Sequence, residues 1–189
     1  MTRVQDVTMG DRAAELAFEL IRSIGAASHW LAGIPPARTG ERPRPGGWSA
    51  REIVGHLIDS ASNNHGRFVR AALDDSMVFA TYDQEAWVAL QHYQDDDWQA
   101  LLHRWRSFND QLASTILHIP AARLTAARRE HNLDRVAWKT VAANEPVTLA
   151  YFIGDYIEHM NHHLAQIAAL CGVSEREVRG SRCRMGEDA

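Results

Sequence analysis

Hydrophobic residues recur three and four positions apart along most of the chain, which is the spacing of one face of an α-helix. This spacing predicts four long amphipathic helices, at residues 11–31, 50–73, 95–119 and 151–170. Two short helices are expected beside them, one after Asp83 with Trp87 buried, and one after Ser174. No segment alternates apolar and polar residues in the way that predicts a strand, and no internal repeat is found.

Capping residues mark where the helices begin. Ser49 and Glu52 form the pattern of a capping box, in which side chains and backbone of the first turn bond one another. Asp11 and Thr148 are the expected caps of the first and the last long helix. The acidic run at 95–97 suits the positive end of a helix dipole, so we interpret it as the start of the third long helix rather than as a metal site.

Two long segments lack a helical period. Residues 33–47 are rich in proline and glycine and are expected to form a loop that wraps the body or covers an opening. Residues 120–146 carry one apolar island, Val136–Ala137–Trp138, among charged residues. They are expected to form either a short strand pair or an irregular flap. A segment of this length without a period usually has a functional role or hides an unrecognised element.

Four long amphipathic helices predict an all-α protein, a four-helix bundle with short extra helices and a long loop before the last long helix. The 189 residues are enough for one domain with a proper core. We place that domain at residues 1–178 and expect residues 179–189 to form a frayed tail. An exposed helix face is expected to make the protein a homodimer.

The composition excludes several classes of function. The formal net charge of −4 argues against a protein that binds nucleic acid by neutralising phosphates. No apolar run approaches the ~20 residues that a membrane span needs, and no secretory signal is expected at the N-terminus. The two cysteines, Cys171 and Cys183, make no disulfide framework, so a reducing, cytoplasmic location is predicted.

The sharpest chemical signal is a pair of histidines on the last long helix. His159 and His163 stand four residues apart, so their imidazoles can point at one spot. Because the chain has 10 histidines, such a pair can also arise by chance, and half-buried imidazoles often serve only as hydrogen-bonding groups. A metal site needs a third ligand. His56, on the inward face of the second helix, supplies it if it faces the pair across the bundle. Otherwise it is a core histidine bonded to a carbonyl.

Two carboxylates lie about one helical turn from these histidines. Asp59 follows His56 and is either the group that orients its second ring nitrogen or a partly exposed carboxylate. Asp155 precedes His159 and could orient a ligand, accept a proton or bind the ion itself. We take Asp59 and Asp155 as the candidate catalytic residues. Three imidazoles would leave a coordination position open for water or substrate, and nitrogen ligands suit zinc, nickel, iron or copper.

These residues fall within three patches of sequence that occur in a fixed order. The patches are Trp48-Ser49 with His56-Leu57-x-Asp59, then Tyr82-Asp83-Gln84-Glu85-Ala86-Trp87, and last His159-x-x-x-His163-x-x-Gln166-Ile167. Together they resemble the DinB/YfiT-like superfamily, over roughly residues 11–172. The resemblance implies a four-helix bundle that binds one divalent transition metal (zinc or nickel, with iron as a further possibility) through His56, His159 and His163. It also implies that His162 lies outside the metal shell and that Gln166 supports the ligands or packs beside them.

The resemblance implies two kinds of chemistry. Some members of that superfamily are metal-dependent hydrolases, and others transfer a low-molecular-weight thiol onto an electrophile or use one in an isomerisation. We therefore expect a metal-dependent enzyme that activates a thiol or water against a small-molecule substrate, with a metal-dependent hydrolase as the alternative. An alternative of another class is a metal-binding or stress-response bundle without turnover. Arg67 and Arg70 could hold the carboxylate of a cosubstrate or be ordinary surface residues.

Overall fold

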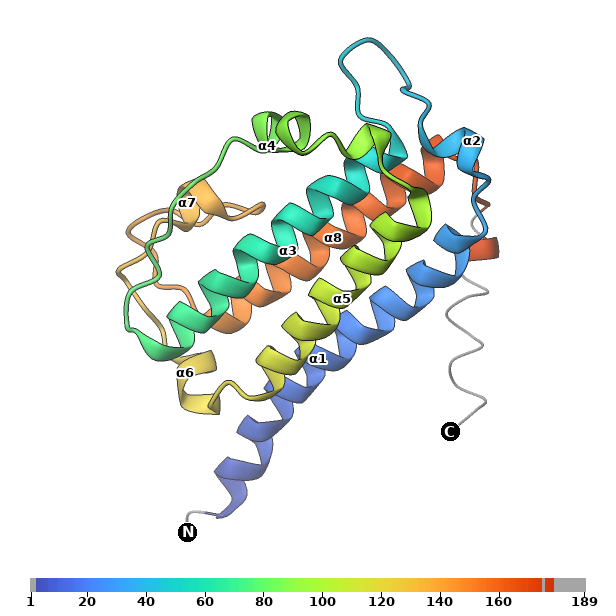
Figure 1. Ribbon diagram of the computed structural model, residues 1–189. Coiled ribbons are helices and arrows are strands. Elements are labelled where there is room, and N and C mark those ends of the chain that lie inside the picture. The colour runs from blue at the N-terminus through green and yellow to red at the C-terminus, as the bar shows by residue number, and fades with distance from the viewer. Residues whose placement is uncertain (1–2, 175, 179–189) are drawn as a thin grey trace.

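Four long helices build the molecule, and shorter helices and irregular segments surround them (Figure 1). The computed structural model describes residues 3–174 and 176–178, with side chains from Arg12 onward. The long helices are α1 (Arg3–Ala32), α3 (Ala50–Leu73), α5 (Trp98–Leu117) and α8 (Leu149–Leu170). The short ones are α2 (Pro36–Thr39), α4 (Gln84–Gln91), the 3₁₀ helix η1 (Tyr93–Asp95), α6 (Ala121–Thr125) and α7 (Leu133–Val136). Within these residues the only β structure is two isolated bridges, which confirms the all-α bundle.

The order of the helices around the bundle differs from their order along the chain. α1 packs against α5 and α8, and α3 packs against the same two helices. α1 and α3, which follow one another among the long helices, therefore lie diagonally across the bundle, as do α5 and α8. Each diagonal link crosses an end of the bundle, which explains why residues 33–49 and 118–148 are long and poor in regular structure. The arrangement also makes α3 and α8 neighbours, so residues far apart in the sequence can meet between them.

Capping contacts confirm three of the predicted helix starts. Ser49 Oγ accepts the Glu52 N–H at 3.3 Å, and the Glu52 carboxylate accepts the Ser49 N–H at 2.9 Å, which completes the capping box of α3. Thr148 caps α8 and Asp97 caps α5, each by accepting a backbone N–H from the first turn. Each of these contacts satisfies an N–H that has no partner within its helix.

Two local predictions are wrong. α1 begins at Arg3, so Asp11 lies inside the helix and not at its cap. Trp87 is 38% exposed rather than buried, because its ring packs against Tyr82, with ring centroids 4.8 Å apart, and not into the core. The short helix predicted after Ser174 lies only partly within the described residues, and the predicted tail at 179–189 lies outside them.

Large side chains from the long helices form the core. Trp98 and Trp105 of α5, Phe68 of α3 and Phe152 of α8 are among its largest fully buried members. The Phe68 and Phe152 rings meet edge to face with centroids 5.6 Å apart, a geometry that favours aromatic pairs and holds α3 against α8. No helix within the described residues combines the length and apolar character of a membrane span.

A missing side chain allows a close approach between α3 and η1. The ring of Tyr93 lies directly on the backbone of Gly55, and a Cβ atom at that position would stand 2.0 Å from Tyr93 Cδ2. Real atoms do not approach so closely, so glycine is required where these two elements touch. Gly55 immediately precedes His56, so the same contact with Tyr93 also supports the turn of α3 that carries His56.

Two segments cover the groove between α3 and α8: the connector, residues 74–83, and the flap, residues 120–146 (Figure 1). The flap is irregular and contains α6 and α7, not a strand pair. Asn132 of the flap joins it to the connector by two hydrogen bonds with the backbone of Phe79. Its Oδ1 accepts the Phe79 N–H at 3.0 Å, and its Nδ2 donates to the Phe79 carbonyl oxygen at 2.8 Å. The two segments therefore form one continuous cover.

Candidate metal centre

Three histidines from two neighbouring helices meet at one point. His56 comes from α3, and His159 and His163 come from α8. The Nε2 atom of His159 lies 3.4 Å from that of His56 and 3.0 Å from that of His163. One nitrogen of each lies within 4.8 Å of the other two, and no other group of three His, Cys, Asp or Glu residues is so placed in the described part of the chain. The structure thus brings together the three residues predicted as ligands.

The spacing of these nitrogens fits a bound metal ion. Zinc–nitrogen bonds of about 2.0–2.1 Å in a tetrahedral site place ligand nitrogens ~3.3 Å apart, and two of the three pairs are close to that separation. A neutral imidazole has one N–H, so three facing nitrogens cannot all be satisfied by one another. In addition, His56 Nδ1 is buried without a hydrogen-bond partner. The donor set therefore fits a divalent transition metal, with all three ligands neutral nitrogens.

Gln166 determines which nitrogen of His163 faces the cluster. Its Oε1 lies 2.8 Å from His163 Nδ1, and its Nε2 lies 3.0 Å from His162 Nε2. An amide oxygen only accepts hydrogen bonds, so His163 Nδ1 carries the proton and its Nε2 presents a lone pair to the cluster. His162 is exposed and lies outside the group of three. It supports the orientation of Gln166 by accepting the amide N–H.

Burial keeps the clustered imidazoles neutral. Removal from water, together with the smaller effect of the charge of His163, lowers the pKa of His56 and that of His159 to about 3. Burial also lowers the pKa of His163, against the opposing effect of its hydrogen bond to Gln166. Because metal ions bind the neutral form of histidine, the cluster is ready to bind at neutral pH without first releasing protons.

The metal-free protein is expected to lose stability in mild acid. In the unfolded chain His56 and His159 take up protons near pH 6.5, whereas their folded pKa values are about 3. The unfolded state therefore binds more protons than the folded state between these values. The contribution of the two neutral histidines to the free energy of unfolding is fully present above pH 6.5 and is lost as the pH decreases. The free energy of unfolding should fall by roughly 2 kcal/mol between pH 6.5 and 5.5. Urea unfolding in the presence of chelator measures this. The double variant His56→Asn, His159→Asn should lose most of the dependence, and an equal dependence in both proteins would contradict the assignment.

Asp59 lies behind the cluster, against η1 and α4. Its Oδ1 accepts hydrogen bonds from the Tyr93 hydroxyl at 2.8 Å and from Gln91 Nε2 at 2.5 Å. Burial raises the pKa of Asp59, although the bond from Tyr93 opposes this. Its Oδ2 is buried without a partner, as is Nδ1 of His56 one turn earlier on α3. Two buried atoms without hydrogen-bond partners, Asp59 Oδ2 and His56 Nδ1, therefore belong to residues one turn apart on α3.

Asp155 fixes the flap to α8. Its Oδ2 accepts the N–H of Trp138 at 2.9 Å and its Oδ1 accepts the N–H of Lys139 at 2.7 Å. Both oxygens are therefore engaged by the flap backbone, and Asp155 is not part of the histidine group. Burial raises its pKa, and the two backbone bonds oppose this. The anchor holds the Trp138 ring near His159, with centroids 6.1 Å apart.

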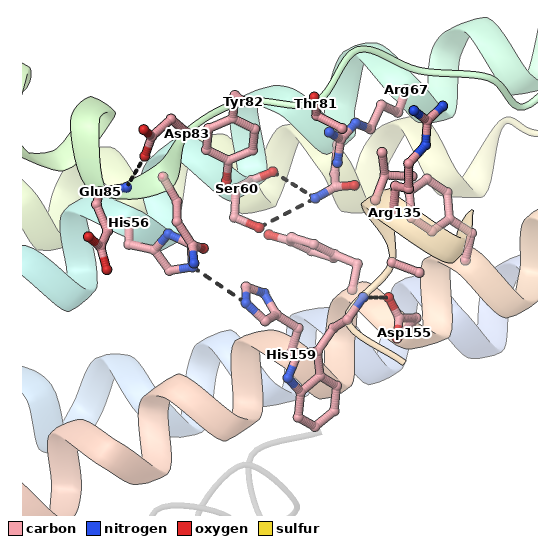
Figure 2. A pocket seen from close by; sticks show the side chains of 17 residues that line it. His56, Ser60, Arg67, Thr81, Tyr82, Asp83, Glu85, Arg135, Asp155 and His159 are labelled. Carbon is pink, nitrogen blue, oxygen red and sulfur yellow. Dashed lines mark hydrogen bonds between the residues drawn. The ribbon is translucent and has the colours of Figure 1, made fainter. Parts of the chain in front are cut away.

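A cavity of about 570 Å³ opens beside the histidines (Figure 2). One helical face of α3 forms part of its floor, through His56, Ser60, Asn64 and Arg67, which are spaced at three and four residues. A matching face of α8 ends in His159. The connector, the first turn of α4 and the flap supply the remaining walls. The size is that of a site for a small molecule.

Tyr82 presents a free hydroxyl in this cavity. It lines the wall, and its hydroxyl makes no hydrogen bond within the described residues. Burial raises the pKa of Tyr82 to about 12, so the phenol stays protonated and can donate a hydrogen bond. In the sequence Tyr82 is visible only as part of an aromatic patch, because a connector residue has no periodicity that tells which way it points. The cavity position of Asn64 was missed for a different reason, since a polar residue on a helical stripe does not by itself indicate a cavity.

Comparisons with known proteins agree with this arrangement. A profile of the DinB superfamily matches residues 19–167. Over 138 residues the chain is 28% identical to "Putative metal-dependent hydrolase YfiT" of Bacillus subtilis, an alignment that covers 67% of this chain and 66% of that one. It is also 28% identical over 134 residues to "Putative metal-dependent hydrolase OB0782" of Oceanobacillus iheyensis, covering 68% of this chain and 67% of the relative. The chain thus spans about two thirds of the length of these relatives.

A solved structure has the same fold. It is YfiT from Bacillus subtilis, described as a probable metal-dependent hydrolase with an unusual four-helix bundle topology. The TM-score is 0.58, the identity 20%, and the match covers 90% of this chain and 87% of that one. At this identity the comparison shows that the fold is shared and nothing more. In our structure that fold has diagonal connections between the long helices.

Proposed function

The chain belongs to the DinB superfamily, and from that premise we propose that it is a metal-dependent enzyme acting on a small electrophilic substrate. His56, His159 and His163 are its metal ligands, with zinc or nickel as the expected ion and iron as a further possibility. The observation that carries the proposal is the convergence of three neutral imidazoles, with no carboxylate among them, beside a cavity of small-molecule size.

The residues around the ligands have separate tasks. Held by three neutral ligands, a divalent ion supplies Lewis acidity that makes a water or a thiol nucleophilic near neutral pH. Gln166 holds His163 in the tautomer that binds. We assign Asp59 to the orientation of His56, since its free Oδ2 and the free Nδ1 of His56 lie one turn apart. Asp155 positions the flap and takes no direct part in the reaction.

Tyr82 is our candidate for contact with the substrate. A protonated phenol that lines the cavity can donate a hydrogen bond to an oxygen that gains negative charge during the reaction. Two tryptophans limit water around the ligands: the Trp48 ring lies 5.1 Å from that of His56, and Trp138 lies beside His159. The reacting centre is therefore expected where Tyr82 and the histidines face the same space.

The nucleophile is either water or an external low-molecular-weight thiol. Water is favoured by the names of the relatives, which are those of hydrolases. We expect a thiol to come from a small molecule. Cys171, the cysteine within the described residues, is buried away from the cavity lining, and burial raises the pKa of its thiol. A thiolate is the form that reacts, so a cysteine with a raised pKa is a poor nucleophile.

A turnover screen distinguishes these possibilities. Zinc- or nickel-loaded protein is assayed with monochlorobimane and a panel of thiols, and in parallel with ester and amide substrates without thiol. Metal-dependent consumption of the bimane only with a thiol supports a transferase, and metal-dependent hydrolysis without thiol supports a hydrolase. Stoichiometric metal binding with no metal-dependent rate on either panel overturns the proposal and favours a binding module without turnover.

Tyr82→Phe is expected to reduce kcat by about 100-fold on the substrate that this screen identifies, because one hydrogen-bond donor to the developing charge is lost. Metal content should be unchanged, since Tyr82 is not a ligand. Tyr151→Phe is the matched control, because its hydroxyl donates to the Lys139 carbonyl oxygen outside the cavity. Equal activity in the two variants would exclude Tyr82 from contact with the substrate.

A further inference from the structure

Arg67 carries a buried positive charge that no carboxylate neutralises. The residue is 6% exposed, and its Nη2 donates one hydrogen bond of 3.0 Å to the Ala80 carbonyl oxygen. No ion pair formed within the described residues includes Arg67. Its ionisable neighbour is the phenol of Tyr82, with the Arg67 Cζ 6.0 Å from the ring centroid. Burial lowers its pKa, but a guanidinium remains charged at neutral pH.

Two other arginines show what distinguishes Arg67. Arg128 is equally buried at 6%, but it donates to the carbonyl oxygens of Ala71 at 2.6 Å and Arg123 at 2.8 Å, and it does not line the cavity. Arg70, about one turn further along α3, is exposed. By contrast, Nε and Nη1 of Arg67 make no hydrogen bond within the described part of the chain, and Arg67 lines the cavity. Unused donors on a buried cation are costly, and an anion satisfies them well.

Arg67 and the histidines stand at opposite ends of one cavity floor. A rise of about 1.5 Å per residue places the Cα atoms of His56 and Arg67 about 16 Å apart along α3. Helical side chains lean toward the helix N-terminus, which brings the guanidinium back toward His56. Figure 2 shows Arg67 and Arg135 on the side of the cavity away from His56. Phe152 also lines the cavity, and its ring contacts that of Phe68, the residue after Arg67. Ser60 and Asn64 line the stretch of α3 between Arg67 and His56.

The acidic groups around the cavity do not compensate this charge. Asp83 and Glu85 lie on the histidine side in Figure 2, and Asp83 caps α4 by accepting two backbone N–H groups. Asp155 has both oxygens engaged by the flap backbone. The cavity therefore has a cationic end at Arg67. Its carboxylates either lie on the histidine side, as those of Asp83 and Glu85 do, or are engaged by backbone N–H groups, as that of Asp155 is.

We propose that Arg67, with Arg135 at the same end of the cavity, binds the carboxylate of an elongated small-molecule substrate whose reacting part lies at the histidine end. A guanidinium binds a planar carboxylate through parallel N–H donors, which fixes orientation as well as position. The inference rests on the proposed function for the place of the reaction, but binding of the anion itself depends only on Arg67 and its surroundings. The substrate class is thus an elongated monoanionic acid, with several bonds between its carboxylate and its reacting part.

Three probes of the same length separate charge from shape and from metal binding. Hexanoate is anionic, hexanamide has its shape without the charge, and pentane-1-sulfonate keeps the charge but is a weaker metal ligand. Their affinities are measured by ligand-observed NMR titration on protein without a tag. The proteins are the wild type and the variants Arg67→Met, Arg67→Lys and Arg70→Met, all loaded with zinc, and His159→Ala, which is used without metal. Thermal unfolding is recorded for each.

Both anions should bind the wild type at least about ten-fold more tightly than the amide. This preference should be lost in Arg67→Met, reduced in Arg67→Lys, and unchanged in the exposed control Arg70→Met and in His159→Ala. The inference is overturned if the wild type binds the anions no more tightly than the amide, a result that needs no variant to fold. It is also overturned if Arg67→Met keeps the preference while His159→Ala loses it, because the anions then bind at the histidines. If the preference for anions depends on Arg67 but the protein shows no turnover, the anion site is supported and only the proposed function is rejected.

Discussion

His159→Ala is expected to lower the affinity of the protein for zinc or nickel by more than about 100-fold. Loss of a residue that only supports a metal ligand costs about 10–100-fold, so loss of a ligand should cost more. His159 is the central member of the cluster, since its Nε2 lies 3.4 Å from that of His56 and 3.0 Å from that of His163. Without it, two nitrogens on different helices remain. Metal analysis by mass spectrometry, on protein purified without a histidine tag, measures the result.

The matched control is His103→Ala, which removes an exposed histidine from α5 and should leave about one equivalent of metal bound. Chelator should also lower the thermal stability of the wild type and of this control, but not that of His159→Ala. At a free metal concentration of about 1,000 Kd the bound ion contributes about 4 kcal/mol, which is a Tm shift on the order of 10 °C for a chain of this size. If the wild type binds no metal after incubation with zinc and nickel, the histidines are core residues and not metal ligands.

Gly55→Ala is expected to lower the free energy of unfolding by about 3 kcal/mol or more, although alanine favours helices by about 1 kcal/mol over glycine. The new Cβ would stand 2.0 Å from Cδ2 and 2.2 Å from Cγ of Tyr93. Tyr93 is 2% exposed and is held by its hydroxyl, which donates to Asp59. The ring cannot move aside cheaply, so the strain reaches the upper end of that seen for overpacked cores.

Gly154→Ala provides the opposite result in the same protein. Gly154 also lies within a long helix, α8, but a Cβ there meets no atom within 4 Å. The helical preference of alanine should then act alone and stabilise the protein by about 0.5–1 kcal/mol. Urea unfolding of both variants beside the wild type measures the difference. Similar stabilities for the two variants would mean that η1 does not pack on α3 as described.

The sequence predicts the long helices well because their signals are local. The capping box at Ser49 and Glu52 and the cap at Thr148 depend on residues within one turn, and both are confirmed. The start of α1 was misplaced for the same reason: an aspartate that suits a cap also fits inside a helix, and a capping residue does not stop the chain before it from being helical. Local signals locate helices more reliably than they locate their ends.

The flap could not be predicted because distant partners hold it. Its order depends on Asn132 with Phe79, on Arg128 with Ala71, and on Asp155 with the Trp138 and Lys139 amides. None of these pairs leaves a periodic pattern in the sequence.

The candidate site also combines local signals, which the sequence shows, with long-range contacts, which it does not. The spacing of His159 and His163 is visible within one helix, whereas the cavity position of Tyr82 follows only from how the connector is tied down.

The histidine cluster also bears on the order of events in folding. His56 and His159 are 103 residues apart in the chain, yet their ring nitrogens face each other. Their meeting requires α3 and α8 to dock, and α8 is reached only after a link that crosses the bundle. Contacts of such long range form after local ones, because the entropy of closing a long loop must be overcome first. Acquisition of the ion would then report completion of the bundle, so that in a refolding chain metal capture follows collapse instead of nucleating it.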